Sequence, residues 1–101
     1  MSDVAGVIEF NAKPGRGGEV ARLIADALPH VEAETGTPLW LVIRSKADPD
    51  AVFLVDLFTN DAALDAHMTG KAAEQIFRTV PPLLSGDPKI HPAEVIARKG
   101  A

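Results

Sequence analysis

Two acid–base residues of this chain stand among apolar neighbours, where groups that move protons are often found. Asp56 interrupts the apolar run 52–58, and His67 follows Leu64 in a segment with helical periodicity. A carboxylate or an imidazole in such surroundings can remove a proton from a substrate, so we predict Asp56 and His67 as catalytic groups. A purely structural role for His67, packed on an amphipathic helix, is the alternative.

Four further residues could bind an aromatic substrate or hold its anion. Asn11 and Arg44 carry donors that can stabilise an oxyanion, while Trp40 and Phe58 offer rings on which a substrate ring can stack. Simpler roles remain open for them. Arg44 and Asp56, brought close by a hairpin, could form an ion pair that only fixes an interface, and the two aromatic rings could be interface core.

Composition and charge argue against several other classes of protein. The 101 residues carry a formal net charge of -4, with no basic stripe for nucleic acid and no cysteine for a disulfide or a thiol nucleophile. The three histidines lack the spacing of a metal motif, so we expect no metal site. The loop 14–18 could hold an anion, but it lacks the ending of a P-loop.

The start of the chain has no basic region followed by an apolar run, and no stretch approaches the ~20 apolar residues that cross a bilayer. We therefore predict a cytoplasmic protein with no membrane partner.

Apolar periodicity and turn residues predict the order strand, helix, strand, strand, helix, strand. The strands are expected at residues 4–12, 39–45, 52–58 and 89–98, with helices at about 19–31 and 61–80. Pro29 predicts a kink or a broken last turn, Gly70 an interruption, and Pro92 an edge strand or a bulge. This order predicts one α+β domain over residues 1–101, a ferredoxin-like βαββαβ fold whose two helices cover one face of a four-stranded antiparallel sheet.

Alternation along the strands divides their side chains into two sets. The wholly apolar set is expected to pack beneath the helices: Ile8, Phe10, Ala12, Leu39, Leu41, Ile43, Phe53, Val55 and Leu57. The other set is mainly apolar with a few polar groups: Val7, Glu9, Asn11, Trp40, Val42, Arg44, Val52, Leu54, Asp56 and Phe58. Leaving it in water would forfeit about 1.5–3 kcal/mol for each large side chain, so we predict a homodimer that covers it and encloses a small-molecule cavity.

Four short segments occur in an order and spacing that is familiar from a known family. They are the turn 13–15 before an amphipathic helix, the strand entry 34–40, the hairpin turn 48–50 and the helix 61–67. Together they resemble the antibiotic biosynthesis monooxygenase (ABM) family over nearly the whole chain. The resemblance implies a dimeric α/β barrel, and an activity that oxygenates anthrones or quinols without metal or flavin, or that degrades haem.

Several positions depart from the family pattern. Thr37 stands where a cysteine is often found, and Asp56 and Phe58 stand where the third strand commonly carries Glu and Trp. The ligand histidine of the haem-degrading members would fall near Phe77, so the resemblance implies an oxygenase and not a haem-degrading enzyme. Other members of the family have no established activity.

The sequence therefore predicts a cofactor-independent monooxygenase that acts on a small aromatic quinol, anthrone or polyketide-like substrate in a cavity between sheet and helices. The substrate supplies the electrons: Asp56 or His67 deprotonates a phenol, and Arg44 and Asn11 hold the anion. Two alternatives stay open, an isomerase or dehydratase that works by proton transfer in the same barrel, and a non-catalytic dimer that binds a small molecule.

Overall fold

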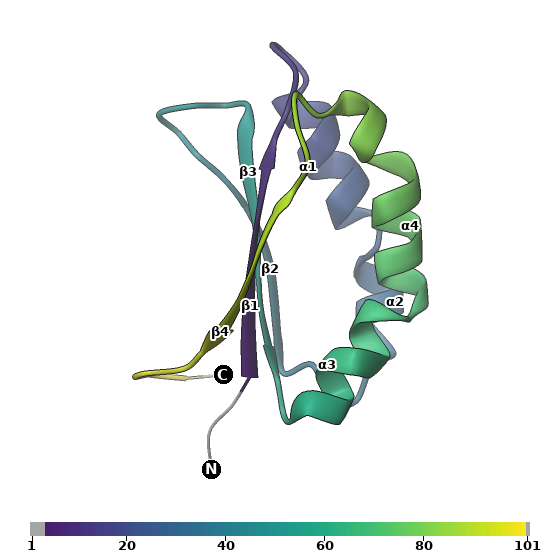
Figure 1. The fold of residues 1–101 in the computed structure, drawn as a ribbon, viewed down its shortest axis with the longest axis vertical. Helices are drawn as coiled ribbons and strands as arrows, with labels where there is room; N and C mark the ends of the chain where they lie inside the picture. The colour runs from purple at the N-terminus through teal and green to yellow at the C-terminus, as the bar shows by residue number, and fades with distance from the viewer. Residues whose placement is uncertain (1–3, 101) are drawn as a thin grey trace.

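The computed structural model describes residues 4–100, so the ends of the predicted domain, residues 1–3 and 101, lie outside the described residues. Four strands pair antiparallel in the order β2-β3-β1-β4: β1 (Val4–Asn11), β2 (Leu39–Arg44), β3 (Ala51–Phe58) and β4 (Lys89–Glu94). The helices lie on one side of this sheet (Figure 1): α1 (Gly17–Ala25), α2 (Leu28–Glu32), α3 (Asp61–Met68), α4 (Lys71–Thr79) and the short 3-10 helix η1 (Pro81–Leu83). The predicted α+β, ferredoxin-like architecture is confirmed.

Both predicted helices are broken where proline and glycine indicated. Pro29 lies in the first turn of α2, where its missing N–H costs no helical hydrogen bond, and the break precedes it. Gly70 is the N-cap of α4, directly after the end of α3. Asn60 caps α3 as expected, because its Oδ1 accepts the backbone N–H of Ala63 at 2.8 Å.

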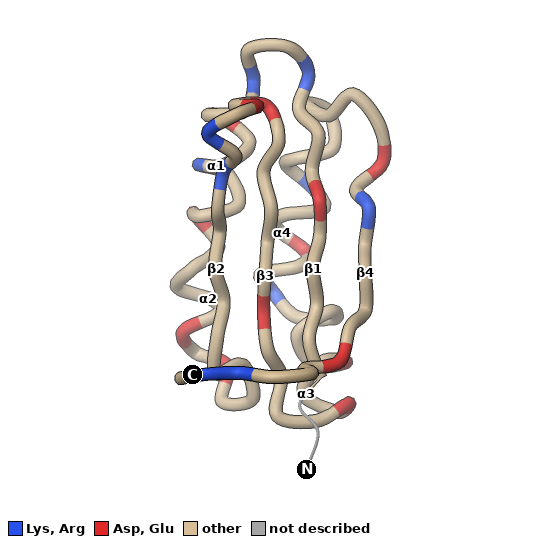
Figure 2. Tube along the Cα trace, turned by 90° about the vertical axis from the view of Figure 1, so that its left-hand side faces the viewer, with Lys and Arg blue, Asp and Glu red and all other residues tan. Residues whose placement is uncertain are grey.

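The last strand is shorter than the predicted span 89–98. It is an edge strand, as Pro92 indicated, and its final residue Glu94 pairs with Val4, the first described residue of β1. The chain beyond Glu94 has no described strand residue left to pair with. It leaves the sheet and crosses the side that carries no helices (Figures 1 and 2), with Ile96 85% exposed.

The assignment of side chains to the two faces of the sheet was correct for β1 and wrong for β2 and β3. Opposed pairs place Ile8 beside Leu54 and Leu54 beside Val42, so these three share a face. That face packs on the helices, because strand and helix side chains form one buried cluster, among them Phe10, Val20, Ile24, Val52, Leu54, Ile76 and Val80. Six residues predicted beneath the helices lie instead on the helix-free side: Leu39, Leu41, Ile43, Phe53, Val55 and Leu57. Both faces of β2 and β3 are apolar, so alternation could not distinguish them.

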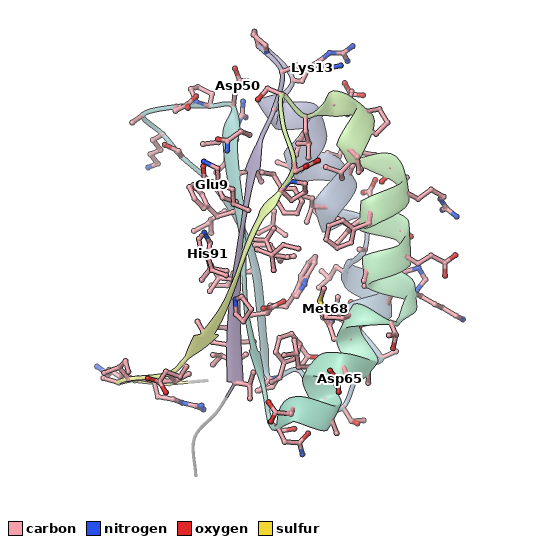
Figure 3. The ribbon with its side chains drawn as sticks, viewed as in Figure 1. Glu9, Lys13, Asp50, Asp65, Met68 and His91 are labelled. Carbon is pink, nitrogen blue, oxygen red and sulfur yellow. The ribbon has the colours of Figure 1, made fainter. Side chains whose placement is uncertain are left out.

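The helix-free side, which we call the open face, is itself rich in apolar side chains. Leu41 and Ile43 are 45% and 49% exposed on it, next to the partly buried Phe53 and Val55. Figure 2 looks onto this face and shows few charged positions along the middle of the strands, while Figure 3 shows Glu9 and His91 pointing out on this side. An exposed apolar surface therefore exists on this side of the sheet, although on β2 and β3 it is formed by different residues from those predicted.

The loop before α1 holds a carboxylate of the chain itself. Asp50, in the turn between β2 and β3, accepts the N–H of Gly15 at 3.1 Å and that of Gly17 at 3.0 Å. Gly15 has a φ of 81°, and a Cβ on Gly17 would collide with the carbonyl oxygen of Pro49. The loop 14–18 is thus an anion-binding turn whose anion is Asp50.

We predict that Asp50→Ala lowers the free energy of unfolding by about 1 kcal/mol, because the start of α1 loses its acceptor. Urea denaturation measures the change, with Asp87→Ala in the exposed turn after η1 as the matched control. Equal stability of the two variants would contradict this assignment of Asp50.

A candidate acid–base site between sheet and helices

A buried carboxyl group marks the centre of the site. Asp56 lies on the central strand β3, is 3% exposed and faces the helices, with Gly6 of β1 and Trp40 of β2 directly opposite on its two sides. A Cβ on Gly6 would come within 2.6 Å of Asp56 Oδ1. The missing side chain of Gly6 therefore leaves the space that the carboxyl group occupies.

The surroundings of Asp56 make its carboxylate a stronger base than an exposed one. Burial raises the pKa of Asp56 from 3.8 to about 6, His67 opposes that rise, and the negative charge of Glu34 adds to it. A general base is most effective when its pKa is close to the working pH, so this shift brings Asp56 towards the range in which a base works at neutral pH.

His67 connects Asp56 to a second carboxylate. It projects from α3 towards the sheet and is 4% exposed, and its ring centroid lies 5.0 Å from that of Phe58. Nε2 faces Asp56 Oδ2 at 3.6 Å, and Nδ1 lies 2.7 Å from Glu34 Oε1. Since a carboxylate can only accept, Nδ1 donates this hydrogen bond and the lone pair of Nε2 faces Asp56 when the imidazole is neutral.

Glu34 was not predicted as a site residue. It belongs to the loop between α2 and β2, and its Oε1 also accepts the hydroxyl of Thr37 at 2.7 Å. Gly36 brings this loop close to α3, since a Cβ on Gly36 would lie 2.5 Å from the Cβ of Ala63. Glu34 lies in the segment 34–40 that carried part of the family resemblance, but nothing in the sequence connects it to a histidine 33 residues away.

Two pockets lie at the two ends of this series of side chains. The sheet–helix pocket has a volume of about 160 Å³ and mainly apolar walls, with Asp56 as one of its few polar groups; it is lined by Ala5, Gly6, Ile8, Asp56, Phe58, Leu64, Asp65, Met68 and Ile90–Pro92. Figure 3 shows Met68 in the space between sheet and helices. The loop pocket, about 470 Å³ and more polar, is lined by Ala33–Thr37, Thr59, Asn60, Ala63, Ala66 and His67.

The structure brings together three of the six residues predicted for the site and places a fourth beside them. Asp56, His67 and Phe58 form the site, and Trp40 lies opposite Asp56 on the neighbouring strand. Within the described part of the chain the indole Nε1 of Trp40 is buried without a hydrogen-bond partner. A buried donor without a partner is unusual in a folded protein.

Arg44 and Asn11 lie elsewhere. Arg44 pairs with Val52 at the other end of β2, about 13 Å along the strand from Trp40, and its Nε donates to the carbonyl of Pro49 at 2.7 Å. The predicted proximity of Arg44 to Asp56 is therefore wrong, because the hairpin register separates them. Asn11 lies on the open face, where its amide donates to Glu9 Oε2 at 2.8 Å.

Over residues 4–100, no group of three or more histidine, aspartate and glutamate side chains is arranged to hold a metal ion. In the same range, no helix has the length and apolar character needed to cross a membrane.

Comparison with known proteins identifies the class of this protein. Residues 4–79 match the antibiotic biosynthesis monooxygenase family, and the chain belongs to that family. Comparison with curated protein sequences yields no match.

Solved structures share the fold over almost the whole chain. A Nitrosomonas europaea protein of unknown function, NE2512, is 32% identical and superimposes with a TM-score of 0.88. The match covers 100% of this chain and 96% of the Nitrosomonas europaea chain. PA3566 from Pseudomonas aeruginosa is 20% identical, with a TM-score of 0.84 and coverages of 96% and 97%. A solved antibiotic biosynthesis monooxygenase is 14% identical, with a TM-score of 0.81 and coverages of 93% and 99%.

The raised pKa of Asp56 predicts a specific dependence of stability on pH. The native state binds this proton more tightly than the unfolded chain, so the stabilisation is complete below pH 3.8 and is lost as the pH rises through about 6. Asp56→Asn, which stays neutral, should therefore gain stability relative to the native protein by up to about 3 kcal/mol between pH 3.5 and pH 8.

Urea denaturation at several pH values measures this difference, with Asp65→Asn at an exposed position of α3 as the control. Parallel stability curves for Asp56→Asn and the native protein would show that Asp56 is not destabilised by burial of its charge.

Proposed function

We propose that this chain is a cofactor-independent monooxygenase that acts on a small aromatic quinol in the sheet–helix pocket, with Asp56 as the general base. The observation that carries the proposal is a buried carboxyl group, with its pKa raised to about 6, in a pocket whose other walls are mainly apolar and include Phe58. Membership of the antibiotic biosynthesis monooxygenase family supports the same reaction class.

The reaction needs a base, a substrate that is easily oxidised, and molecular oxygen. Asp56 removes the hydroxyl proton, and the electron-rich anion that results reduces oxygen and forms a carbon–oxygen bond with it. The hydroperoxide formed loses water and leaves a carbonyl, so one oxygen atom enters the product and the other leaves as water with the two substrate hydrogens.

The size of the pocket favours a single aromatic ring. An apolar cavity of about 150 Å³ is known to hold benzene, and the sheet–helix pocket has a similar volume of about 160 Å³. Phe58, Leu64 and Met68 would contact the faces and edge of such a ring. Among the predicted substrates, a one-ring quinol therefore fits this pocket better than a three-ring anthrone.

We further propose that residues 1–101 form a single domain that works as a homodimer through its open face. Leu41 and Ile43 are about half exposed there, and the C-terminal segment that crosses this side (Figures 1 and 2) includes Ile96, which is 85% exposed. A second copy would remove these side chains from water. Because the site faces the helices, the dimer leaves it accessible. The cytoplasmic location stays a prediction from the sequence.

Proton-transfer isomerisation is the second candidate, and the pairing of Asp56 with His67 favours it. A carboxylate and an imidazole 3.6 Å apart can remove a proton at one position of a substrate and return it at another, with no oxidant. Product analysis separates the candidates, because only oxygenation consumes oxygen.

We predict oxygen uptake with one-ring hydroquinones in buffer that contains a chelator and no flavin. The value of kcat/KM should rise with pH and reach half its maximum near pH 6, because the ionised form of Asp56 is the base. Asp56→Asn should lower kcat about 100-fold or more, measured with an oxygen electrode.

Asp87→Asn, in an exposed turn, is the matched charge control. If the native protein takes up no oxygen with a broad panel of hydroquinones and anthrones, the oxygenase proposal is contradicted. An isomerised product formed without oxygen uptake would favour the second candidate.

For the dimer, we predict that Ile43→Arg yields monomers at micromolar concentration in analytical ultracentrifugation, because a charge would have to be buried among the apolar side chains of the open face. Leu28→Arg is the matched control, since Leu28 is similarly exposed, at 43%, but lies on α2 in the helical layer. A native protein that sediments as a stable monomer would contradict the proposed dimer.

A further inference from the structure

We infer that Glu34 is a positioning and proton-accepting residue, and that Glu34, His67 and Asp56 form a route by which the substrate proton leaves the sheet–helix pocket for the loop pocket. The inference rests on the proposed function, since it assigns the fate of the proton that the base removes.

The three side chains form an unbroken series between the two pockets. Asp56 lines the sheet–helix pocket, Glu34 lines the loop pocket, and the buried His67 lies between them with one ring nitrogen towards each carboxylate. The hydrogen bond from Nδ1 to Glu34 measures 2.7 Å, and Nε2 lies 3.6 Å from Asp56. A shift of less than 1 Å by either side chain would bring Nε2 and Asp56 within hydrogen-bond distance.

Glu34 decides which ring nitrogen of His67 is able to accept a proton. A carboxylate at Nδ1 keeps the proton of neutral His67 on that nitrogen, so the lone pair of Nε2 points at Asp56. Without Glu34, the neutral ring would gain more by protonating Nε2 and donating to Asp56, and it could no longer accept from it. The Thr37 hydroxyl, which donates to the same Oε1, helps to hold Glu34 in place.

A proton on Asp56 has few other ways out. Apart from Asp65 of α3 and the segment Ile90–Pro92 of β4, the residues around Asp56 in the sheet–helix pocket are apolar, and a bound ring would displace water there. The loop pocket is larger and more polar, and it reaches Glu34 and His67 directly.

The proton transfers balance. The substrate hydroxyl proton passes to Asp56, then to Nε2 of His67, while the Nδ1 proton passes to Glu34 and from there to water in the loop pocket. After oxygen has added to the substrate anion, one proton returns along the same series in reverse. It completes the hydroperoxide and restores the first tautomer of the imidazole, so the chain is unchanged after one turnover.

The first test needs no turnover. Nitrogen-15 NMR of labelled histidine at high pH should show His67 protonated on Nδ1 in the native protein and shifted towards Nε2 protonation in Glu34→Ala. Glu32→Ala, an exposed glutamate of α2, is the matched control and should leave the tautomer unchanged. An Nε2-protonated His67 in the native protein, or the same tautomer in Glu34→Ala, would overturn the inference.

The second test uses the oxygenation of a one-ring hydroquinone. Glu34→Gln keeps an acceptor for Nδ1 but no longer accepts a proton, so kcat should fall about 10-fold to 100-fold with KM unchanged, whereas Glu32→Gln should match the native protein. Formate, a small carboxylate that fits the loop pocket, should restore part of the kcat of Glu34→Ala. Full activity of Glu34→Gln, or a loss in Glu34→Ala that formate does not change, counts against the relay.

The two failures are distinguishable. If the native protein consumes no oxygen with any quinol, the proposed function fails, and the tautomer of His67 still decides whether Glu34 controls the imidazole. If oxygen uptake is normal but neither Glu34 variant is impaired, the function stands and the relay fails.

Discussion

The burial of one carboxyl group, that of Asp56, is the constraint on which the site depends. A carboxylate on the central strand of a sheet, under a layer of helices, is disfavoured unless a neighbour compensates its charge. His67 faces this carboxyl group at 3.6 Å and opposes the rise in its pKa, and the position of His67 itself depends on Glu34 on the other side of the ring. Loss of any one of the three leaves a buried polar group without its partner, so the cluster behaves as a unit.

Three separate parts of the chain supply this unit, and local backbone features bring them together. Gly6 leaves space on β1 for the carboxyl group, and Gly36 lets the α2–β2 loop approach α3 so that Glu34 reaches His67. The break at Gly70 separates α3 from α4. Stability is reduced at the site because a buried charge has no stabilising role in the fold, which is a common cost of function.

The sheet is apolar on both faces, and this property has two consequences. One face packs on the helices and holds the site, and the other remains as the open face with Leu41 and Ile43 in solvent. Alternation can divide a strand into two sets, but it cannot say which set meets the helices when both are apolar. The polar character of Asp56 and Arg44 suggested an outward face, whereas Asp56 is inside because its neighbours compensate it, and Arg44 is at the sheet's end, where it reaches solvent.

The sequence by itself determined the order of the elements, the helix breaks at Pro29 and Gly70, the Asn60 cap and the family, and it indicated Asp56 and His67 as candidate catalytic groups. These follow from local chemistry: missing N–H groups, capping side chains, periodicity, and polar residues in apolar runs. Only the tertiary structure decided which face of β2 and β3 meets the helices. It also decided that Arg44 and Asn11 lie away from Asp56, and that Glu34 forms a hydrogen bond with His67. Those depend on strand register and on a contact between residues 33 positions apart, and no local pattern encodes either.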